Sequence, residues 1–491
     1  MTYRALLAGN ADFRRLWAGQ VVSEIGDWLN NIAVLALAIE LAGPARQGHA
    51  VAVYAVARHL PLFLFGPVAG VVVDRADRRR VMIAADVARA VLALGFLLAQ
   101  KFSALPLIYA VGAALFSVSA FFNAAKRATL PNLVARTDEL LAANSLSAST
   151  TAGTIAVGSA LGGLVATFAG RETVFLLNAA TFVLSALLIS RIRPSIADCG
   201  LRIADASIAD LGLRNADLKE PNVGEGLSDR EPQILSPELE VASRRPAISN
   251  SKAPLQSAIR NPQSAIKRAF ADFREGLRYV RSDGVLAGVF VVAAGWGLGN
   301  GAARSLYSVF GARLGELSAA GWLARPKDFG ISVLFVAMGA GGVLGAPLAR
   351  RFNTGGGTSL GARMGRSLLF DGCGLFLFSL MPSLWGAAVV LVAREMNYAV
   401  WWTAQQTILM RRTDNAYAGR VFATHETVTT LAMVCAIYAA GAAADTCGIR
   451  VVAAAGGAII ALSGAAWFVL RRGGAEVLGS TRAGLRGKDE G

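Results

Sequence analysis

Residues 66–80 read GPVAGVVVDRADRRR and separate an apolar run from a basic cluster. The apolar run stops at Asp74, and a second apolar run starts at Val81. Between them lie Arg75, Arg78, Arg79 and Arg80. A membrane-spanning helix needs about 20 apolar residues, and cytoplasmic loops carry an excess of Lys and Arg. The stretch therefore predicts two membrane helices joined by a short cytoplasmic loop.

The composition supports an integral membrane protein. The chain has 491 residues, of which 54% are hydrophobic and only 16% are charged, whereas soluble domains have roughly 25% charged residues. A net charge of +15 would suggest a nucleic-acid partner in a soluble protein. Here Lys and Arg concentrate in alternate loops between apolar runs, so we expect a lipid bilayer and no nucleic acid around this chain.

Apolar stretches of helical length recur along the chain, six on each side of a long polar segment. They cover about residues 16–41, 51–73, 81–100, 104–125, 144–168, 173–190, 285–311, 329–349, 367–382, 385–408, 421–444 and 449–470. The N-terminal residues are too polar for a cleaved signal sequence, so we expect the first helix to remain in the mature protein. The sequence predicts an all-α membrane protein with twelve transmembrane helices and cytoplasmic termini.

The polar segment suggests a division into two helical bundles. We expect an N-terminal six-helix bundle (1–192), a disordered cytoplasmic linker (193–267), an amphipathic helix with a C-terminal six-helix bundle (268–472) and a cytoplasmic tail (473–491). The linker repeats itself, since Ile196–Asp205 recurs as Ile208–Asp217, and it has few large apolar residues. Apolar residues from Phe270 to Val280 recur at helical spacing and predict an amphipathic helix on the inner leaflet.

The loop between the second and third apolar runs resembles a family signature. Its residues Gly70, Asp74, Arg75, Arg78 and Arg79 are similar to the G-x-x-x-D-R-x-x-R-R/K loop of the major facilitator superfamily of secondary transporters. The stretch Gly345–Phe352 echoes this loop in the second half, with Ala349 in place of the acid. The resemblance implies two pseudo-symmetric bundles and no enzymatic activity, and we expect a monomer without cofactor or metal.

Shorter matches resemble a bacterial efflux branch that includes macrolide exporters and the enterobactin exporter. These matches lie in helix 1, around Gln20 and Asp27, and before helix 5, around Leu130 and Pro131. Residues 158–163 resemble the antiporter pattern G-P-x-x-G-G, but Ser159 replaces its proline, so this motif does not secure proton antiport. The resemblance implies location in the bacterial inner membrane.

Polar residues form stripes on helices that line the central cavity in the resembled family. The candidate cavity residues are Gln20, Glu24, Asp27 and Asn31 in helix 1, Asn123 in helix 4, Trp296, Asn300, Arg304 and Tyr307 in helix 7, and Arg394, Asn397, Trp401 and Gln405 in helix 10. Polar side chains facing lipid are costly, so these stripes face either a water-filled path or polar partners on neighbouring helices.

Three carboxylates are candidates for proton coupling. Asp27, Glu24 and Glu395 lie within apolar spans, and removal from water favours the protonated form of a carboxyl group. We expect Asp86 and Arg89 to support the basic loop instead. The family resemblance implies that the loop motif acts as a conformational latch, in which we expect Asp74 to face Arg420 and the start of the helix expected at 421–444.

These features predict an exporter of amphipathic small molecules that works by alternating access and is driven by protons. An importer on the same fold is one alternative, and a membrane sensor or assembly subunit that moves no solute is another.

Overall fold

The computed structural model describes residues 3–134, 137–193, 262–319, 321–352, 357–414 and 417–486, and all regular structure within these ranges is helical. The helices are α1 Tyr3–Gly9, α2 Ala11–Ala42, α3 Gln47–Arg75, α4 Arg78–Lys101, α5 Leu105–Leu133, α6 Thr137–Phe168, α7 Arg171–Ser190, α10 Pro262–Ser282, α11 Gly284–Ala319, α12 Pro326–Phe352, α13 Gly357–Leu380, α14 Leu384–Arg412, α15 Ala418–Cys447 and α16 Ile449–Arg486.

Within the described ranges, ten helices are long and apolar enough to cross a membrane. The helices α13 and α14 are of similar length but are not among these ten. Asp371 on α13 pairs with Arg394 on α14 at 2.9 Å. A pair that is neutralised inside the protein allows these two helices to span the bilayer as well. Together they complete the twelve membrane helices expected from the sequence.

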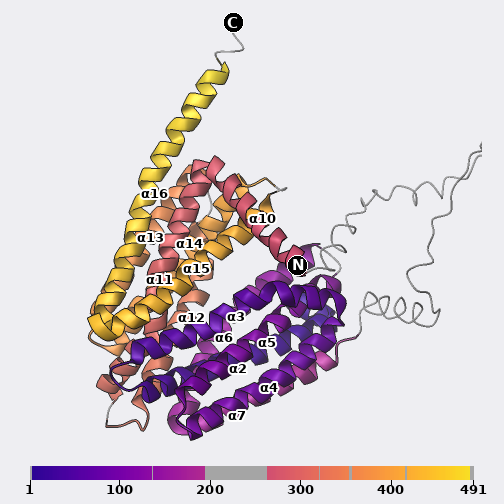
Figure 1. The fold of residues 1–491 in the computed structure, drawn as a ribbon, viewed down its shortest axis with the longest axis vertical. Helices are drawn as coiled ribbons and strands as arrows, with labels where there is room; N and C mark the ends of the chain where they lie inside the picture. Colours follow the sequence, from indigo (N-terminus) through magenta and orange to yellow (C-terminus); the bar gives the residue numbers. More distant parts are fainter. Residues whose placement is uncertain are drawn as a thin grey trace, which may run out of the picture. The chain divides into compact units, whose positions relative to one another are not determined.

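The helices form two bundles with the same internal contacts (Figure 1). In the first bundle, α2 packs against α6 and α7, and α4 packs against α5 and α7. In the second bundle, α11 packs against α15 and α16, and α13 packs against α14 and α16. Each pair of contacting helices in the first bundle corresponds to a pair in the second bundle whose two helices both lie six spans later in the chain. This correspondence is expected for a pseudo-two-fold relation. The predicted fold class is confirmed.

The two bundles meet along two symmetry-related helix pairs, α6 with α12 and α3 with α15. We call the end that holds the turn between α3 and α4 the basic end, and the end where α2 stops at Ala42 the far end. At the far end, a Cβ on Gly48 would lie 2.7 Å from the carbonyl oxygen of Gly441, so α3 and α15 touch there. At the basic end, a Cβ on Gly70 or Gly419 would meet nothing within 4 Å. The bundles are therefore in close contact at the far end, whereas neither Gly70 nor Gly419 packs closely against another residue at the basic end.

Some segments differ from the sequence-based expectation. The linker predicted for 193–267 lies mostly outside the described residues. Helix α16 continues to Arg486, beyond the span predicted to end at 470. The predicted amphipathic helix is present as α10, but its second half packs on protein: a Cβ on Gly276 would clash with Thr424 of α15, and the Tyr279 hydroxyl donates to Asp414 at 3.2 Å.

Candidate functional site

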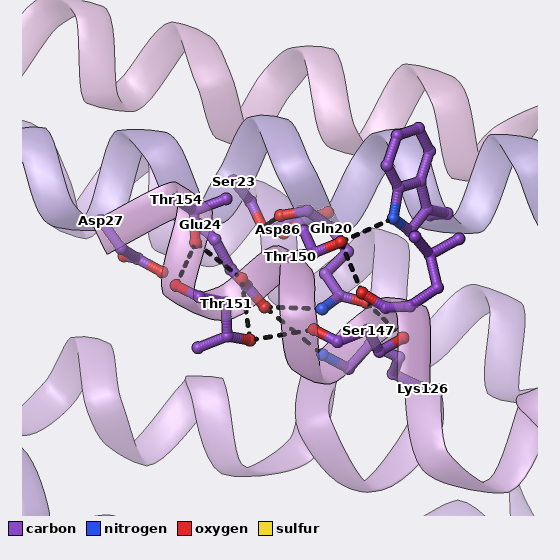
Figure 2. Close-up of polar contacts among 12 residues, drawn as sticks. Gln20, Ser23, Glu24, Asp27, Asp86, Lys126, Ser147, Thr150, Thr151 and Thr154 are labelled. Atoms are coloured by element: carbon purple, nitrogen blue, oxygen red, sulfur yellow. Dashed lines mark hydrogen bonds and ion pairs between the residues drawn. The ribbon is translucent and has the colours of Figure 1, made fainter. Parts of the chain in front are cut away.

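Glu24 is the centre of a polar cluster that joins α2 to α6 (Figure 2). Its Oε1 accepts a hydrogen bond from Gln20 Nε2 at 2.8 Å. Its Oε2 accepts from the hydroxyls of Thr154 at 3.1 Å and Thr151 at 3.3 Å. Lys126 of α5 adds a more distant positive charge, with Nζ 3.8 Å from Oε1. The spacing of Gln20 and Glu24 in the sequence predicted that they share a face, and the structure brings them together.

Asp27 lies one turn further along α2 and faces Arg89 of α4. The distance from Asp27 Oδ2 to Arg89 Nη1 is 4.0 Å. Arg89 also donates a hydrogen bond to Asp86, and its guanidinium packs on the rings of Phe122 and Phe182 at 4.1 and 4.5 Å. The expectation that Asp86 and Arg89 support the basic loop is wrong, because Arg89 points toward the α2 stripe and is only 3% exposed.

Asn31 ends the stripe by accepting a hydrogen bond from Arg58 of α3. The Arg58 guanidinium lies between the rings of Trp28 and Phe116, at 4.9 and 4.8 Å from their centroids. Stacking on two aromatic faces lowers the cost of burying a guanidinium. Arg58 was not among the predicted site residues, although an arginine within an apolar span was a visible signal.

The second bundle holds a denser cluster around Arg394. Arg394 pairs with Asp371 and also donates a hydrogen bond to the hydroxyl of Tyr307 on α11. Asn397, one turn away, donates to the carbonyl of Ser367 at 2.8 Å. Arg394 and Asn397 of the α14 stripe therefore pair with polar groups on neighbouring helices. This is the alternative to a stripe that faces a water-filled path.

Several predicted residues surround a small cavity in the same bundle. The cavity is about 10 Å³ in volume and is lined by Trp296, Asn300, Arg304, Asp371, Arg394, Glu395 and Tyr398. Trp296 stacks on Trp401 and Tyr398, with centroids 4.6 and 5.4 Å apart. Gln405 is buried apart from this group, and its side-chain amide finds no hydrogen-bond partner within the described part of the chain. Asn123 is half-buried on α5.

The far end is closed by contacts that the sequence did not predict. Arg171 of α7 binds Asp328 of α12 through two hydrogen bonds of 2.9 and 2.8 Å and reaches Glu40 of α2 at 2.6 Å. Asp445 of α15 accepts hydrogen bonds from the backbone N–H groups of Gly48 and His49 at 2.8 and 2.9 Å. These contacts join the two bundles at the end opposite the basic loop.

The glycine-rich stretch of α6 fits between the two neighbouring helices. A Cβ on Gly162 would lie 2.7 Å from the Leu29 carbonyl oxygen on α2, and a Cβ on Gly163 would overlap Ser332 of α12. The Ser332 hydroxyl donates to the Ser159 carbonyl oxygen at 2.6 Å. The motif therefore permits close helix packing at the interface between the bundles.

The basic loop fastens the turn between α3 and α4 to other helices of its bundle. Arg78 donates to the Ala128 carbonyl oxygen of α5 at 3.0 Å, and Arg79 donates to the Ser190 carbonyl oxygen at the end of α7. The side chain of Asp74 lies outside the described side chains. Arg420 pairs with Glu275 of α10 at 3.0 Å.

Two related bundles that are joined at one end, with polar stripes on their first helices, define a membrane transporter fold. The Major Facilitator Superfamily profile matches residues 16–434, and the chain belongs to this family. It is therefore a multi-pass membrane transporter and not an enzyme.

Relatives of known sequence include proteins named as exporters. The chain is 33% identical over 175 residues to BacE of Bacillus amyloliquefaciens, named as a candidate bacilysin exporter, a match that covers 36% of this chain and 42% of BacE. It is 38% identical over 74 residues to macrolide efflux protein A of Streptococcus pyogenes, covering 15% of this chain and 18% of that protein. The chain thus matches less than half the length of these relatives.

Solved structures with the same fold are more distant in sequence. A bacterial homologue of the iron transporter ferroportin in an inward-facing state has a TM-score of 0.60 at 12% identity, covering 95% of this chain and 99% of the homologue. The nucleoside transporter NupG has a TM-score of 0.62 at 9% identity, with coverages of 94% and 99%. These likenesses concern the fold alone.

Proposed function

We propose that the protein exports amphipathic small molecules across the bacterial inner membrane as a monomer that works by alternating access. The observation that carries this proposal is the asymmetry between the two ends. Buried contacts such as Arg171 with Asp328 join the bundles at the far end, whereas a Cβ added to Gly70 of α3 or Gly419 of α15 at the basic end would meet no atom within 4 Å. The exporter names of the relatives favour outward transport.

The basic end faces the cytoplasm in this proposal. Arg75 to Arg80 and the N-terminus lie at this end, and the positive-inside rule favours a cytoplasmic position for short basic loops. A protein that is separated at its cytoplasmic end is in the state that loads solute from the cell interior. Closure of that end must then accompany separation of the contacts at the far end.

Protons are the proposed driving ion, with Asp27, Glu24 and Glu395 as the groups that exchange them. Asp27 faces the guanidinium of Arg89 at 4.0 Å, a separation that leaves the pair too long for a direct hydrogen bond. A carboxylate held by charge without a close hydrogen bond can accept a proton with little rearrangement. Glu24 already accepts three hydrogen bonds, so Asp27 is the first candidate.

The test compares flux in the two directions. Inverted membrane vesicles from cells with and without the protein are energised to pump protons inward, and uptake of a panel of radiolabelled amphipathic compounds is measured. We expect uptake into inverted vesicles that collapses on addition of a protonophore. Uptake only into right-side-out vesicles would instead identify an importer, and the absence of flux for the whole panel would contradict the proposal.

A further inference from the structure

The first bundle contains a second, larger cavity between α2, α5 and α6 near the basic end. Its volume is about 230 Å³, less than the roughly 300–1,000 Å³ of a site for a whole drug-sized molecule. The cavity is therefore large enough for one end of a solute. It is distinct from the small cavity around Arg394, which lies in the second bundle.

Among the described side chains, two positive charges and no carboxylate line this cavity. Lys126 and Arg127 are adjacent on α5, and the remaining polar lining consists of Gln20, Ser147 and Thr151. Glu24 is the nearest carboxylate to Lys126, but it does not belong to the cavity wall and its oxygens already accept hydrogen bonds from α2 and α6. The wall therefore favours an anionic group.

The ammonium of Lys126 has hydrogen atoms available for a ligand. Its closest partner is Glu24 at 3.8 Å, which is an ion pair too long for a hydrogen bond. Among the described residues, no acceptor forms a hydrogen bond with Lys126, although the side chain is only 21% exposed. An anion in the cavity could accept these hydrogen bonds while Glu24 keeps its three other donors.

The rest of the cavity lining is apolar and aromatic. It is formed by Phe13, Leu16, Trp17 and Leu130. The Trp17 indole is held in place because its Nε1 donates to the Thr150 hydroxyl at 2.9 Å. A fixed aromatic face in the same cavity as a cation fits a ligand that carries both an apolar group and a negative charge.

We propose that this cavity is a recognition subsite for amphipathic anions, with Lys126 binding the anionic group and Trp17 packing against the adjoining apolar part. The proposal deepens the export function above, since it assigns carboxylate- or phosphate-bearing solutes to the transporter. The same chemistry could come from a solute or from the headgroup of an anionic lipid. The experiment separates these two sources.

The test measures binding without transport. The purified full-length protein is placed in nanodiscs of zwitterionic phosphatidylcholine, and dansyl fluorescence reports binding of N-dansyl-leucine and of its neutral amide. We expect the carboxylate to bind about tenfold or more tightly than the amide, as expected for a charged hydrogen bond in a partly buried site. The change Lys126→Gln should reduce this preference to about twofold or less.

Two further variants separate recognition from general effects of charge and folding. Lys126→Arg keeps the positive charge and the donors, so it should retain most of the preference for the carboxylate. Lys101→Gln removes a charge from the end of α4, outside the cavity, and should leave the preference unchanged. Equal binding of the two probes to the wild type, or an unchanged preference in Lys126→Gln, would overturn the proposal.

The source of the anion follows from a change of lipid. If phosphatidylglycerol in the nanodisc displaces the carboxylate probe from the wild type and not from Lys126→Gln, the subsite accepts a lipid headgroup. If the probe still binds, the subsite accepts a soluble solute. Selective binding without flux in vesicles would contradict the proposed export and leave the anion subsite supported, whereas flux of neutral compounds alone would contradict the subsite and leave export supported.

Discussion

The Arg171 guanidinium and the Asp328 carboxylate form a bidentate pair that links the two bundles at the far end, with distances of 2.9 and 2.8 Å. Arg171 begins α7 of the first bundle, and Asp328 lies in the first turn of α12 of the second. The residues are 5% and 0% exposed, respectively. A buried bidentate pair is strong and geometrically specific, so it stabilises the state in which the far end is closed.

Replacing Asp328 by Asn should open the far end more often. The amide keeps the shape but loses the charge, and it leaves Arg171 buried with one weaker acceptor. We expect the open fraction to rise about tenfold to a hundredfold, as for loss of a charged hydrogen bond. The measurement is the rate at which a membrane-impermeant maleimide labels Ser159→Cys in a chain without other cysteines, because Ser159 is 0% exposed in this state.

Glu40→Gln provides the matched control for Asp328→Asn. Glu40 also contacts Arg171, at 2.6 Å, but its side chain is 57% exposed. Exposed ion pairs contribute about 0–1 kcal/mol, so the labelling rate should change by no more than a few-fold. Equal effects of the two substitutions would show that burial of the pair does not govern closure.

Close packing of α6 against α12 should also govern closure. A Cβ on Gly339 would lie 2.6 Å from Ala156 Cα, and backbone atoms cannot move aside as a flexible side chain can. A Cβ on Gly342, in the same helix, would make an ordinary contact of 3.5 Å with the Ala152 Cβ. We therefore expect Gly339→Ala to raise labelling of Ser159→Cys about tenfold or more, and Gly342→Ala to leave it nearly unchanged.

The comparison is informative only for protein that inserts normally. Membrane abundance and the melting temperature of the purified variants are measured together with the labelling rate. A folded Gly339→Ala protein with the wild-type labelling rate would contradict the role of this contact in closure.

The sequence predicted the helices and the polar stripes because both depend on local spacing. A stripe at helical intervals brings Gln20 and Glu24 to one face of α2 whatever the remainder of the chain does. The partner of each polar residue depends on tertiary packing. Arg171 and Asp328 are 157 residues apart, and each is a charge near a helix terminus, where the sequence gives no sign of a partner.

The same limit explains the misplacement of Arg89 and the mixed result for α14. Position along α4 suggested that Arg89 supports the basic loop, but the direction of its side chain depends on the rotation of α4 about its axis. For α14, helical spacing alone does not distinguish a stripe that faces water from one that faces α11 and α13. The pairing of Arg394 with Asp371 depends on how α14 packs against α13, which helical spacing does not specify.

Asp27→Asn should uncouple transport from the proton gradient. The amide keeps a similar shape beside Arg89 but cannot exchange a proton, so driven flux should fall by at least about tenfold, in the range of one lost charged interaction. Flux in reconstituted vesicles is measured with and without an imposed pH gradient, and exchange of labelled for unlabelled solute measures the uncoupled cycle. Exchange should persist in the variant.

Glu24→Gln is the control for Asp27→Asn, since Glu24 lies one turn away on the same face of α2. Its hydrogen bonds to Thr151 and Thr154 can be kept by an amide oxygen, so we expect a smaller loss of driven flux. Normal driven flux in the Asp27 variant together with loss in the Glu24 variant would transfer the coupling role to Glu24.

The helices α3 and α15 carry carboxylates at opposite ends of the protein, and these carboxylates should act in opposite directions. At the far end, Asp445 of α15 accepts hydrogen bonds from the Gly48 and His49 N–H groups in the first turn of α3. This contact places a negative charge at the positive end of a helix dipole. At the basic end, Asp74 lies in the last turn of α3, and α15 begins at Ala418. When the far end opens and the basic end closes, we expect Asp74 to approach the start of α15 in the same manner.

Asp445→Asn should therefore raise the labelling rate of Ser159→Cys, and Asp74→Asn should lower it. A carboxylate at a helix N-terminus contributes about 0.3–2 kcal/mol, which corresponds to a change of about twofold to thirtyfold in a two-state equilibrium. Asp74→Asn should also slow turnover without changing the affinity for solute, because Asp74 lies in the last turn of α3, away from the midplane where transporters of this type bind solute. Asp74 lies at the end of α3 and Asp445 of α15 contacts its start, so their effects should add and the double variant should return toward the wild-type rate. A shift of both single variants in the same direction would show that the two carboxylates do not stabilise opposite states.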